Sequence, residues 1–380
     1  MSSFVARINA ELRGDRVIWA IIALVSIFSI MAVYSSTGTL AYRERGGNTE
    51  AFLFKHLIIL SVGLLMTYIC HLLHYMKYHR WAPALFLLAI PMLFYTLTLG
   101  TDINEAKRWV MIPYVGISFQ TSDFAKLALI IFVARSISTK QDYIKDFNSA
   151  FLPIIVPVLL VCGLIAPANL STALLLFLTC LGMMFVGRVS IKYIFLLLML
   201  GLVVFSILIF IGQAMPEVVR VETWTNRVKE FMYDPDGGHQ SMQAKIAIAN
   251  GEWFGLGPGN SIQRNYLPSP YSDFIYSIIC EEYGLIGGGV IILLYVLFFF
   301  RITRLVTKSP KAFGAILAMG LGIMLVLQAL VNIAVAVNLV PITGVTLPMI
   351  SMGGTSLMFT CIAFGIILSV SKYIESVATD

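Results

Sequence analysis

Asp273 is the residue whose type and position most favour chemistry in this sequence of 380 residues. It follows Pro268, Pro270 and Ser272 and opens a long apolar run. An aspartate there fits the N-cap of a helix, where its side chain accepts hydrogen bonds from unpaired amides. It equally fits a carboxylate held at a membrane surface, where it would act as a general base toward a lipid-borne substrate. Position alone leaves both interpretations open.

Two further carboxylates, Glu281 and Glu282, lie in the same apolar run. In an unbroken helix they lie about 12 Å from its start, at about 1.5 Å per residue. Carboxylates at membrane depth are costly and seldom incidental. Neighbouring helical positions are about 100° apart, so at least one of the two faces the protein interior. Pairing with a buried base or amide and direct contact with a substrate both remain open.

A third candidate group is Asp123 and Lys126, in "FQTSDFAKLA". Residues three apart share one face of a helix, so the two side chains are expected to meet. They follow closely after Lys107 and Arg108. A plain ion pair is one interpretation, and a site for an anionic lipid head group is the other.

The elements that carry these residues are membrane spans. The sequence is 58% apolar and 12% charged, against roughly 25% charged residues in soluble domains, and its mean hydropathy is +0.87. Unbroken runs such as "FLPIIVPVLLVCGLIAP" exclude a water-soluble globule and a β-barrel of short alternating segments. All five cysteines lie within apolar runs, which argues against a disulfide or zinc framework. The composition predicts an all-α polytopic membrane protein with a single domain over residues 1–380.

About ten transmembrane helices are expected, near residues 17–35, 53–74, 81–100, 121–137, 151–167, 170–187, 190–213, 272–300, 312–336 and 346–371. With both termini in the cytoplasm, most basic residues and few acidic ones fall on the inner side, as the positive-inside rule favours. The net charge of +6 therefore reflects membrane topology, and no nucleic-acid partner is expected.

One connection is much longer than the others, the predicted extracytoplasmic loop at residues 213–272. It is rich in aromatic residues, and "MQAKIAIAN" predicts a short helix that docks on the bundle. Its basic residues include Arg227 and Lys245, on the side where the positive-inside rule disfavours them. Pairing with the acids of the loop and binding of a pyrophosphate leaving group are the two interpretations.

Two glycine-containing segments complete the candidates. In "GLGPGNS" no strand precedes the glycines and Pro258 interrupts them, so a tight turn is favoured over a dinucleotide site. "PITGVTLPMISMGGTS" is a span interrupted by Pro and Gly. Broken backbone at that depth must be buried in protein or line a cavity. A kinked packing element and the wall of a substrate groove are both open.

Together these segments resemble the SEDS family (shape, elongation, division and sporulation), the polytopic proteins typified by RodA and FtsW. The resemblance runs over most of the chain and is strongest in "AKRW", "FQTSDFAK", "GEWFGLGPGNSIQRNYLP", "SDFIYSIICEEYGLIG" and "GVTLPMISMGGTS". "GEWFGLGPGNS" is more similar to the division branch, FtsW, than to RodA.

The resemblance implies a peptidoglycan glycosyltransferase that polymerises lipid II at the outer face of the bacterial cytoplasmic membrane. Its implied partners are a class B penicillin-binding protein transpeptidase and other membrane proteins of the divisome or elongasome. The family's functional positions fall on Asp273, Asp123, Lys126, Arg108, Glu281 and Glu282. The sequence departs from the family pattern by carrying Asp123 in place of a glutamate and Asn169 in place of an aspartate.

The mechanism expected from these residues uses one carboxylate. Asp273 accepts the proton of the acceptor sugar hydroxyl as that oxygen attacks the donor, and a lipid pyrophosphate departs. The charge of the departing pyrophosphate would be neutralised by four basic residues, with a divalent cation (Mg or Mn) as a further candidate. These residues are Arg108, Lys126, Arg227 and Lys245. The alternatives are a lipid II flippase, for which broken helices and intramembrane acids are typical, and a scaffold that only recruits the transpeptidase.

Overall fold

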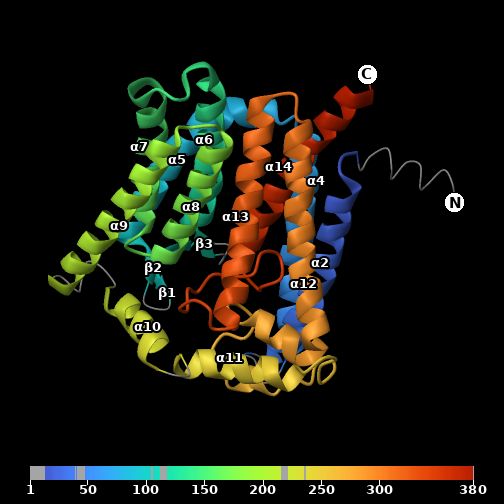
Figure 1. The fold of residues 1–380 in the computed structure, drawn as a ribbon. Helices are drawn as coiled ribbons and strands as arrows, with labels where there is room; N and C mark the ends of the chain where they lie inside the picture. Colours follow the sequence, from blue (N-terminus) through green and yellow to red (C-terminus); the bar gives the residue numbers. More distant parts are fainter. Residues whose placement is uncertain are drawn as a thin grey trace.

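The protein is a bundle of long helices that run between two ends of the molecule (Figure 1). The computed structural model describes residues 13–38, 40, 48–103, 106–111, 118–214, 221–234 and 237–379. Within these residues the bundle helices are α2 (Arg16–Ser36), α4 (Thr49–Leu72), α5 (Met76–Leu99), α6 (Thr121–Thr139), α7 (Leu152–Ile165), α8 (Leu170–Val186), α9 (Ile191–Ala214), α12 (Ile275–Lys308), α13 (Ala312–Ala336) and α14 (Thr355–Thr379). A π-helical turn, Phe147–Phe151, precedes α7, and a 3₁₀ turn, Gln141–Tyr143, follows α6.

Each of the ten expected spans corresponds to one of these helices, so the predicted all-α polytopic fold is confirmed. Of the described helices, seven are long and apolar enough to cross a membrane by length and composition. The helices α8 and α9 are apolar but shorter in their described parts. Helix α6 is less apolar because it carries Asp123, Lys126 and Arg135.

Short polar side chains fix where several helices begin. Asp15 accepts hydrogen bonds from the N–H groups of Val17 and Ile18 at the start of α2. Asn169 accepts one from the N–H of Thr172 at the start of α8. These caps satisfy amides that have no partner within their own helix, which matters most where water is scarce.

The centre of the bundle is formed by α13 and α14, whose apolar windows are 67% buried, against 22% for the peripheral α5. Glycines let α13 approach its neighbours closely, as is typical of membrane helix packing. A Cβ on Gly320 would lie 2.6 Å from the sulfur of Met183 in α8. A Cβ on Gly322 would lie 2.3 Å from Ile302 in α12. Helix α13 therefore packs closely against both α8 and α12.

A small antiparallel sheet, which was not predicted from the sequence, connects α5 to α6. It consists of β1 (Thr101–Ile103), β2 (Ala106–Met111) and β3 (Ser118–Gln120), in that order. Trp109 pairs with Gln120 across β2 and β3. The sheet thereby brings the "AKRW" segment next to the start of α6.

Helix α12 is not one straight span, which corrects the expectation for residues 272–300. Gly284 has φ +69 and ψ −173, a conformation outside the helical region that divides α12 into a short first part and a long second part. Glu281 and Glu282 lie in the short part. Their distance from Asp273 along the chain therefore does not translate into depth in the membrane.

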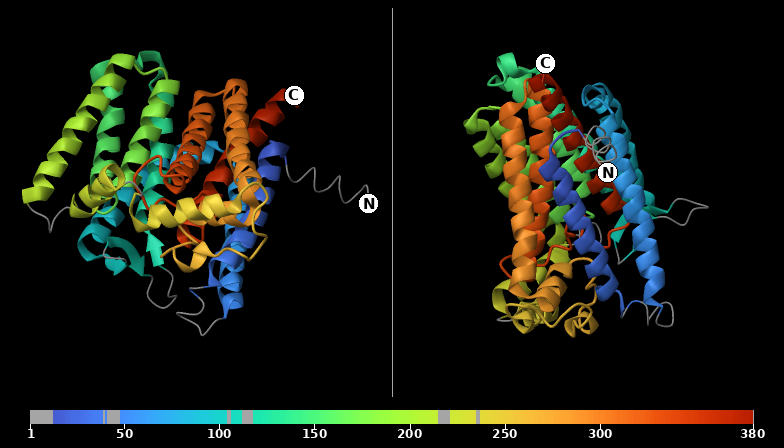
Figure 2. Two further views of the ribbon diagram at one scale, coloured as in Figure 1. Left: turned by 60° about the horizontal axis from the view of Figure 1, so that its bottom comes forward. Right: turned by 90° about the vertical axis from the view of Figure 1, so that its right-hand side faces the viewer.

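The segment between α9 and α12 folds across one end of the bundle (Figure 2). It contains α10 (Val221–Tyr233), α11 (Gly238–Gly251) and a 3₁₀ turn, Gln263–Asn265. The predicted short helix at "MQAKIAIAN" is confirmed as α11, and it packs against α12.

The last expected span begins later than residue 346. Residues 337–354, here called the broken segment, follow α13 without forming a helix, and α14 starts only at Thr355. Pro341 and Pro348 lack the N–H that a helix needs, and Gly344 and Gly354 have positive φ. The predicted interruption of this span is therefore confirmed.

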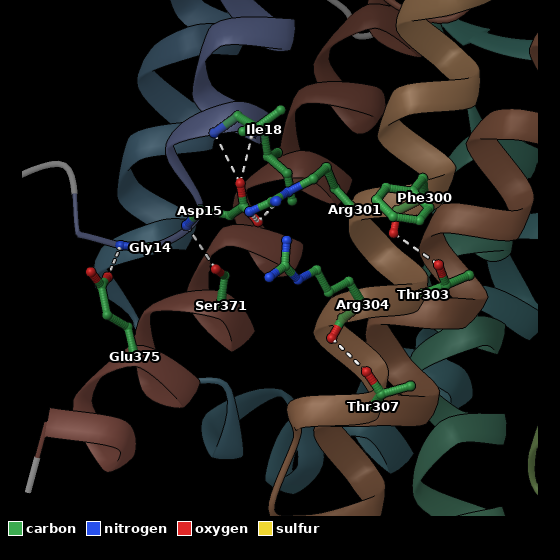
Figure 3. A network of polar contacts seen from close by, with 11 residues as sticks. Gly14, Asp15, Ile18, Phe300, Arg301, Thr303, Arg304, Thr307, Ser371 and Glu375 are labelled. Atoms are coloured by element: carbon green, nitrogen blue, oxygen red, sulfur yellow. Dashed lines mark hydrogen bonds and ion pairs between the residues drawn. The ribbon is translucent and has the colours of Figure 1, made fainter.

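The two described ends of the chain meet at the opposite end of the bundle from α10 and α11 (Figure 1). Figure 3 shows the contacts that hold them. The N–H of Gly14 donates to Glu375 at 2.6 Å, the N–H of Asp15 donates to Ser371 at 2.8 Å, and Arg301 Nε donates to Asp15 at 2.9 Å. The start of α2 is thus joined to both α12 and α14.

Candidate active site

A cavity of about 550 Å³ opens at the end of the bundle that carries α10. Its wall combines the sheet, the starts of α6 and α8, the middle of α13, and the broken segment. The polar and charged residues that line it are Trp109, Gln120, Asp123, Lys126, Asn169, Ser171, Thr172, Arg227, Ser269, Ser272, Asp273, Gln328, Thr343, Thr346 and Ser356. Four of the eight site residues expected from the sequence therefore meet in one place.

Asp273 lies on the cavity wall just before α12. The N-cap residue of this helix is Phe274, so Asp273 does not occupy the N-cap position, and that interpretation is wrong. Ser272 Oγ donates a hydrogen bond of 2.7 Å to Asp273 Oδ1. Gly344, with φ +68, faces the other carboxylate oxygen, and a Cβ added there would lie 3.6 Å from Oδ2. The carboxylate is thus oriented by the neighbouring hydroxyl, and a side chain at residue 344 would be in van der Waals contact with it.

Each of the three backbone carbonyls at residues 271–273 accepts a hydrogen bond from another part of the protein. The carbonyl of Tyr271 accepts from the N–H of Met352 at 2.9 Å. The carbonyl of Ser272 accepts from Ser351 Oγ at 2.7 Å, and the carbonyl of Asp273 accepts from Asn332 Nδ2 at 2.8 Å. Three consecutive peptide groups are therefore fixed by the broken segment and by α13.

Side chains from four helices hold the broken segment in turn. They donate hydrogen bonds to its carbonyls at residues 342, 345, 346, 348 and 350. The donors are Arg227 of α10 at 3.1 Å, Asn332 of α13 at 2.7 Å, Gln328 of α13 at 3.1 Å, Tyr295 of α12, and Ser29 of α2 at 3.0 Å. Irregular backbone at membrane depth needs such partners, because water is absent there. The cavity wall is therefore built from backbone that neighbouring helices fix in place.

Asn332 donates hydrogen bonds both to the backbone at Asp273 and to the broken segment. Its side-chain amide donates to the carbonyl of Asp273 at 2.8 Å and to the carbonyl of Val345 at 2.7 Å, and the residue is 1% exposed. A single buried amide thus connects the peptide of Asp273 to the cavity wall. Asn332 was not among the residues predicted from the sequence, although an amide within an apolar span is itself a signal of a specific role.

Asp123 and Lys126 form the expected pair on one face of α6. Lys126 Nζ lies 2.8 Å from Asp123 Oδ1, and both side chains are largely buried. Asp123 Oδ2 has no hydrogen-bond partner among the described residues. Because both residues line the cavity, their side chains can contact a bound group as well as each other.

The remaining basic candidates differ in position. Arg227 of α10 reaches the cavity and donates to the carbonyl of Ile342 at 3.1 Å. Lys245 of α11 is not among the residues that line the cavity, so the structure does not group it with Asp273. Arg108 lies on β2 beside Trp109, and its side chain is outside the described part of the chain. Its role stays a prediction.

Glu281 and Glu282 do not line the cavity, which corrects their expected contact with a substrate. Both are at most 1% exposed. Glu281 accepts hydrogen bonds from Ser261 Oγ and from the N–H groups of Ile262 and Gln263, at 3.2 Å for each amide. Glu282 accepts one from the hydroxyl of Ser35 in α2. Their carboxylates therefore hold the loop after α11, which is the structural interpretation that the sequence had left open.

Three helices begin at the cavity: α6, α8 and α14. The residues at their starts that line it include Gln120, Asn169 and Ser356. Helix N-termini carry a partial positive charge that favours a bound anion, also where a side chain caps one amide, as Asn169 does at the start of α8. With Lys126 and Arg227 alongside, the cavity is suited to an anionic group next to the Asp273 carboxylate.

The candidate ligands for a divalent cation in the cavity wall are the carboxylates of Asp123 and Asp273. Among the described residues, no group of three His, Cys, Asp or Glu side chains is placed to hold a metal ion. The two carboxylates of the cavity wall, Asp123 and Asp273, do not by themselves form such a set. The divalent cation (Mg or Mn) therefore stays a prediction, because Mg is commonly held by only one or two carboxylates together with substrate phosphates.

Comparison with known proteins agrees with the fold and with the family resemblance. Residues 15–376 match the FtsW/RodA/SpoVE family, described as cell cycle proteins. The probable peptidoglycan glycosyltransferase FtsW of Trichlorobacter lovleyi is 32% identical, over 94% of this chain and 93% of the relative. Stage V sporulation protein E of Bacillus subtilis is 30% identical, over 93% of each chain.

Solved structures show the same fold. A chain of a peptidoglycan synthase complex, studied for the coordination of polymerization and crosslinking, superposes with a TM-score of 0.73 at 23% identity, over 95% of this chain and 98% of the other. The rod shape determining protein RodA of Thermus thermophilus gives a TM-score of 0.68 at 21% identity, over 94% of this chain and 96% of RodA. The chain therefore belongs to the FtsW/RodA/SpoVE family of multi-pass membrane proteins.

Proposed function

We propose that this protein is a peptidoglycan glycosyltransferase that polymerises lipid II, with Asp273 as the general base. The observation that carries the proposal is the placing of one oriented carboxylate beside an anion-attracting wall in a single cavity. Names of relatives at 30–32% identity, which include probable peptidoglycan glycosyltransferase FtsW, support the same activity.

In this mechanism Asp273 accepts the proton of the acceptor sugar hydroxyl. The hydroxyl oxygen attacks the anomeric carbon of the donor, and the bond from that carbon to the lipid pyrophosphate breaks, so that the pyrophosphate leaves with the electron pair. Attack from the face opposite the leaving group inverts the anomeric centre. Asp273 lies on the cavity wall, where an acceptor hydroxyl can approach its carboxylate.

The departing pyrophosphate needs charge neutralisation rather than a proton. Glycosidases use two carboxyl groups because their leaving group is a poor one that must be protonated. Here Lys126, Arg227 and the amides at the start of α14 provide positive charge without a second acid. Asp123 orients the Lys126 ammonium at 2.8 Å.

The orientation in the membrane follows from the distribution of basic residues. With both chain ends in the cytoplasm, the cavity opens on the outer side, where lipid-linked precursors are polymerised. A class B penicillin-binding protein transpeptidase is the proposed partner. A solved relative from a peptidoglycan synthase complex that couples polymerization to crosslinking supports this assignment. The "GEWFGLGPGNS" segment and the relatives named FtsW favour a role in division.

The test is lipid II polymerisation by the purified protein with its transpeptidase, comparing wild type with Asp273→Asn. The matched control is Asp142→Asn, an exposed carboxylate in the turn after α6, at the other end of the bundle. We expect polymer from wild type and from the control, and none from a folded, partner-bound Asp273→Asn. Equal polymer from all three would remove Asp273 from the chemistry. No polymer from wild type, with partner binding verified, would favour a flippase or a scaffold.

A further inference from the structure

The turn at residues 251–257, "GEWFGLG", has no part in the proposed chemistry. It lies between α11 and the 3₁₀ turn and carries two large aromatic side chains that contact little of the protein. Phe254 is 83% exposed, the highest value for a large apolar side chain in the described part of the chain, and Trp253 is 67% exposed. Exposed apolar groups of this size mark an interaction surface.

The turn is nevertheless rigidly attached to α12. Four backbone hydrogen bonds join it to this helix on both sides of Gly284. Their donors are the N–H groups of Leu256, Gly257, Leu285 and Ile286, and their acceptors are the carbonyls of Glu281, Glu282, Glu252 and Trp253, at 2.9, 3.0, 2.8 and 3.3 Å respectively. Trp253 and Phe254 are therefore presented from fixed backbone.

Glycine makes this attachment possible at two positions. A Cβ on Gly255, where φ is +82, would lie 2.2 Å from the carbonyl oxygen of Glu282. A Cβ on Gly284, where φ is +69, would lie 2.2 Å from the carbonyl oxygen of Trp253. No side chain fits at such distances, so the two backbones touch directly.

The attachment also fixes the level of the turn relative to the membrane. The part of α12 that follows Gly284 is about 36 Å long at about 1.5 Å per residue, enough to cross a hydrocarbon core of about 30 Å. Its first residues, Leu285 and Ile286, are 47% and 50% exposed on the outside of the bundle. The turn adjoins these residues, so it lies where the span enters the bilayer.

We propose that Trp253 and Phe254 insert into the interfacial region of the lipid bilayer. The turn then fixes the position of the start of α12, and with it Asp273, relative to the membrane surface. Tryptophan favours this region because its ring is apolar and its indole N–H is polar. The adjacent Glu252 is exposed, so that its polar side chain adjoins the two aromatic rings on the same turn. Continuity with the lipid-facing side of α12 favours lipid over a protein partner as the occupant.

The experiment measures the fluorescence of Trp253 in the full chain, reconstituted without a partner into phosphatidylcholine vesicles. The emission of a Trp253→Phe variant is subtracted from that of wild type to isolate this residue. The lipids carry bromine at carbons 6 and 7 or at carbons 11 and 12 of one acyl chain. We expect a blue-shifted emission, stronger quenching by the shallower bromines, and protection from aqueous iodide relative to N-acetyltryptophanamide.

Two alanine variants test whether the backbone contact between the turn and α12 holds Trp253 in the bilayer. Gly284→Ala places its Cβ against the carbonyl of Trp253, and Gly289→Ala lies in the same helix with open space around its Cβ. We expect the first to lose the depth-dependent quenching of Trp253 and the second to keep it. The proposal would be overturned if iodide fully quenched the Trp253 emission of wild type and brominated lipid did not quench it. Protection that arises only after the transpeptidase is added would overturn it as well, in favour of a protein partner.

Discussion

Replacing Asn332 with alanine tests whether the position of Asp273 limits the reaction. The substitution removes two hydrogen bonds, of 2.8 Å to the carbonyl of Asp273 and 2.7 Å to the carbonyl of Val345. It leaves both carbonyls without that donor, which comes from a side chain that is itself only 1% exposed. The peptide of Asp273 is then free to move away from the cavity wall.

The expected loss is moderate in stability and large in rate. A buried hydrogen bond contributes about 0.5–1.5 kcal/mol, and bonds between membrane helices average about 0.6 kcal/mol, so two bonds correspond to about 1–3 kcal/mol. A misplacement of about 1 Å at a reacting group costs on the order of 100-fold in rate. We therefore expect Asn332→Ala to lower kcat by roughly 10- to 100-fold with little change in KM.

The assay is the initial rate of lipid II polymerisation over a range of substrate concentrations, with thermal stability measured in parallel. Tyr295→Phe is the matched control, because it removes a bond to the carbonyl of Pro348 in the same broken segment but none to the Asp273 peptide. We expect this control to lose stability while keeping kcat. Equal losses of kcat in both variants would refute a positioning role for Asn332, and so would a raised KM at unchanged kcat.

Two further substitutions separate the cavity from the supports around it. Gly344→Ala adds a methyl group 3.6 Å from Asp273 Oδ2 at a residue with φ +68. We expect about 1–2 kcal/mol of backbone strain and a lower kcat, measured by melting temperature and polymerisation rate, and an unchanged rate would show that the acceptor does not use this space. Glu281→Gln weakens the hydrogen bonds to residues 261–263. Thermal melting should then show a loss of about 1–3 kcal/mol, whereas a raised KM at unchanged stability would restore direct contact with the substrate.

Much of the fold could be predicted because membrane-spanning length is a local property of the sequence. Every apolar run corresponds to a helix, and the proline and glycine interruption before α14 is real. The kink at Gly284 could not be predicted, because it depends on backbone contact with residues 251–257. A glycine in an apolar run looks the same whether it breaks the helix or packs against another one. The sheet at residues 101–120 was missed for a similar reason, since short strands are defined by their pairing partners.

The site was predicted in its parts but not in its assembly. The spacing of Asp123 and Lys126 already implied one helical face, and the structure gives an ion pair of 2.8 Å. That this pair shares a cavity with Asp273 and Arg227 depends on the packing of α6, α10 and the broken segment. Glu281 resembled a site residue because buried carboxylates are rare in membranes, and that rarity does not distinguish a support from a ligand.

The pair of Asp123 and Lys126 allows chemistry and structure to be told apart by a double substitution. Lys126→Met alone leaves a buried carboxylate without its partner at 2.8 Å, which costs about 3–5 kcal/mol. Adding Asp123→Asn removes that charge, so the double variant should regain most of the lost stability.

If Lys126 neutralises the departing pyrophosphate, the double variant regains stability but not activity, with kcat still lowered by about 100- to 1,000-fold, the usual cost of removing one such donor. Polymerisation rate and melting temperature, measured on wild type, Lys126→Met, Asp123→Asn and the double variant, give the coupling between the two residues for each property. Recovery of both properties together would show that the pair only supports α6. The leaving group would then depend on Arg227 and the helix N-termini, because these are the other positive groups that line the described cavity.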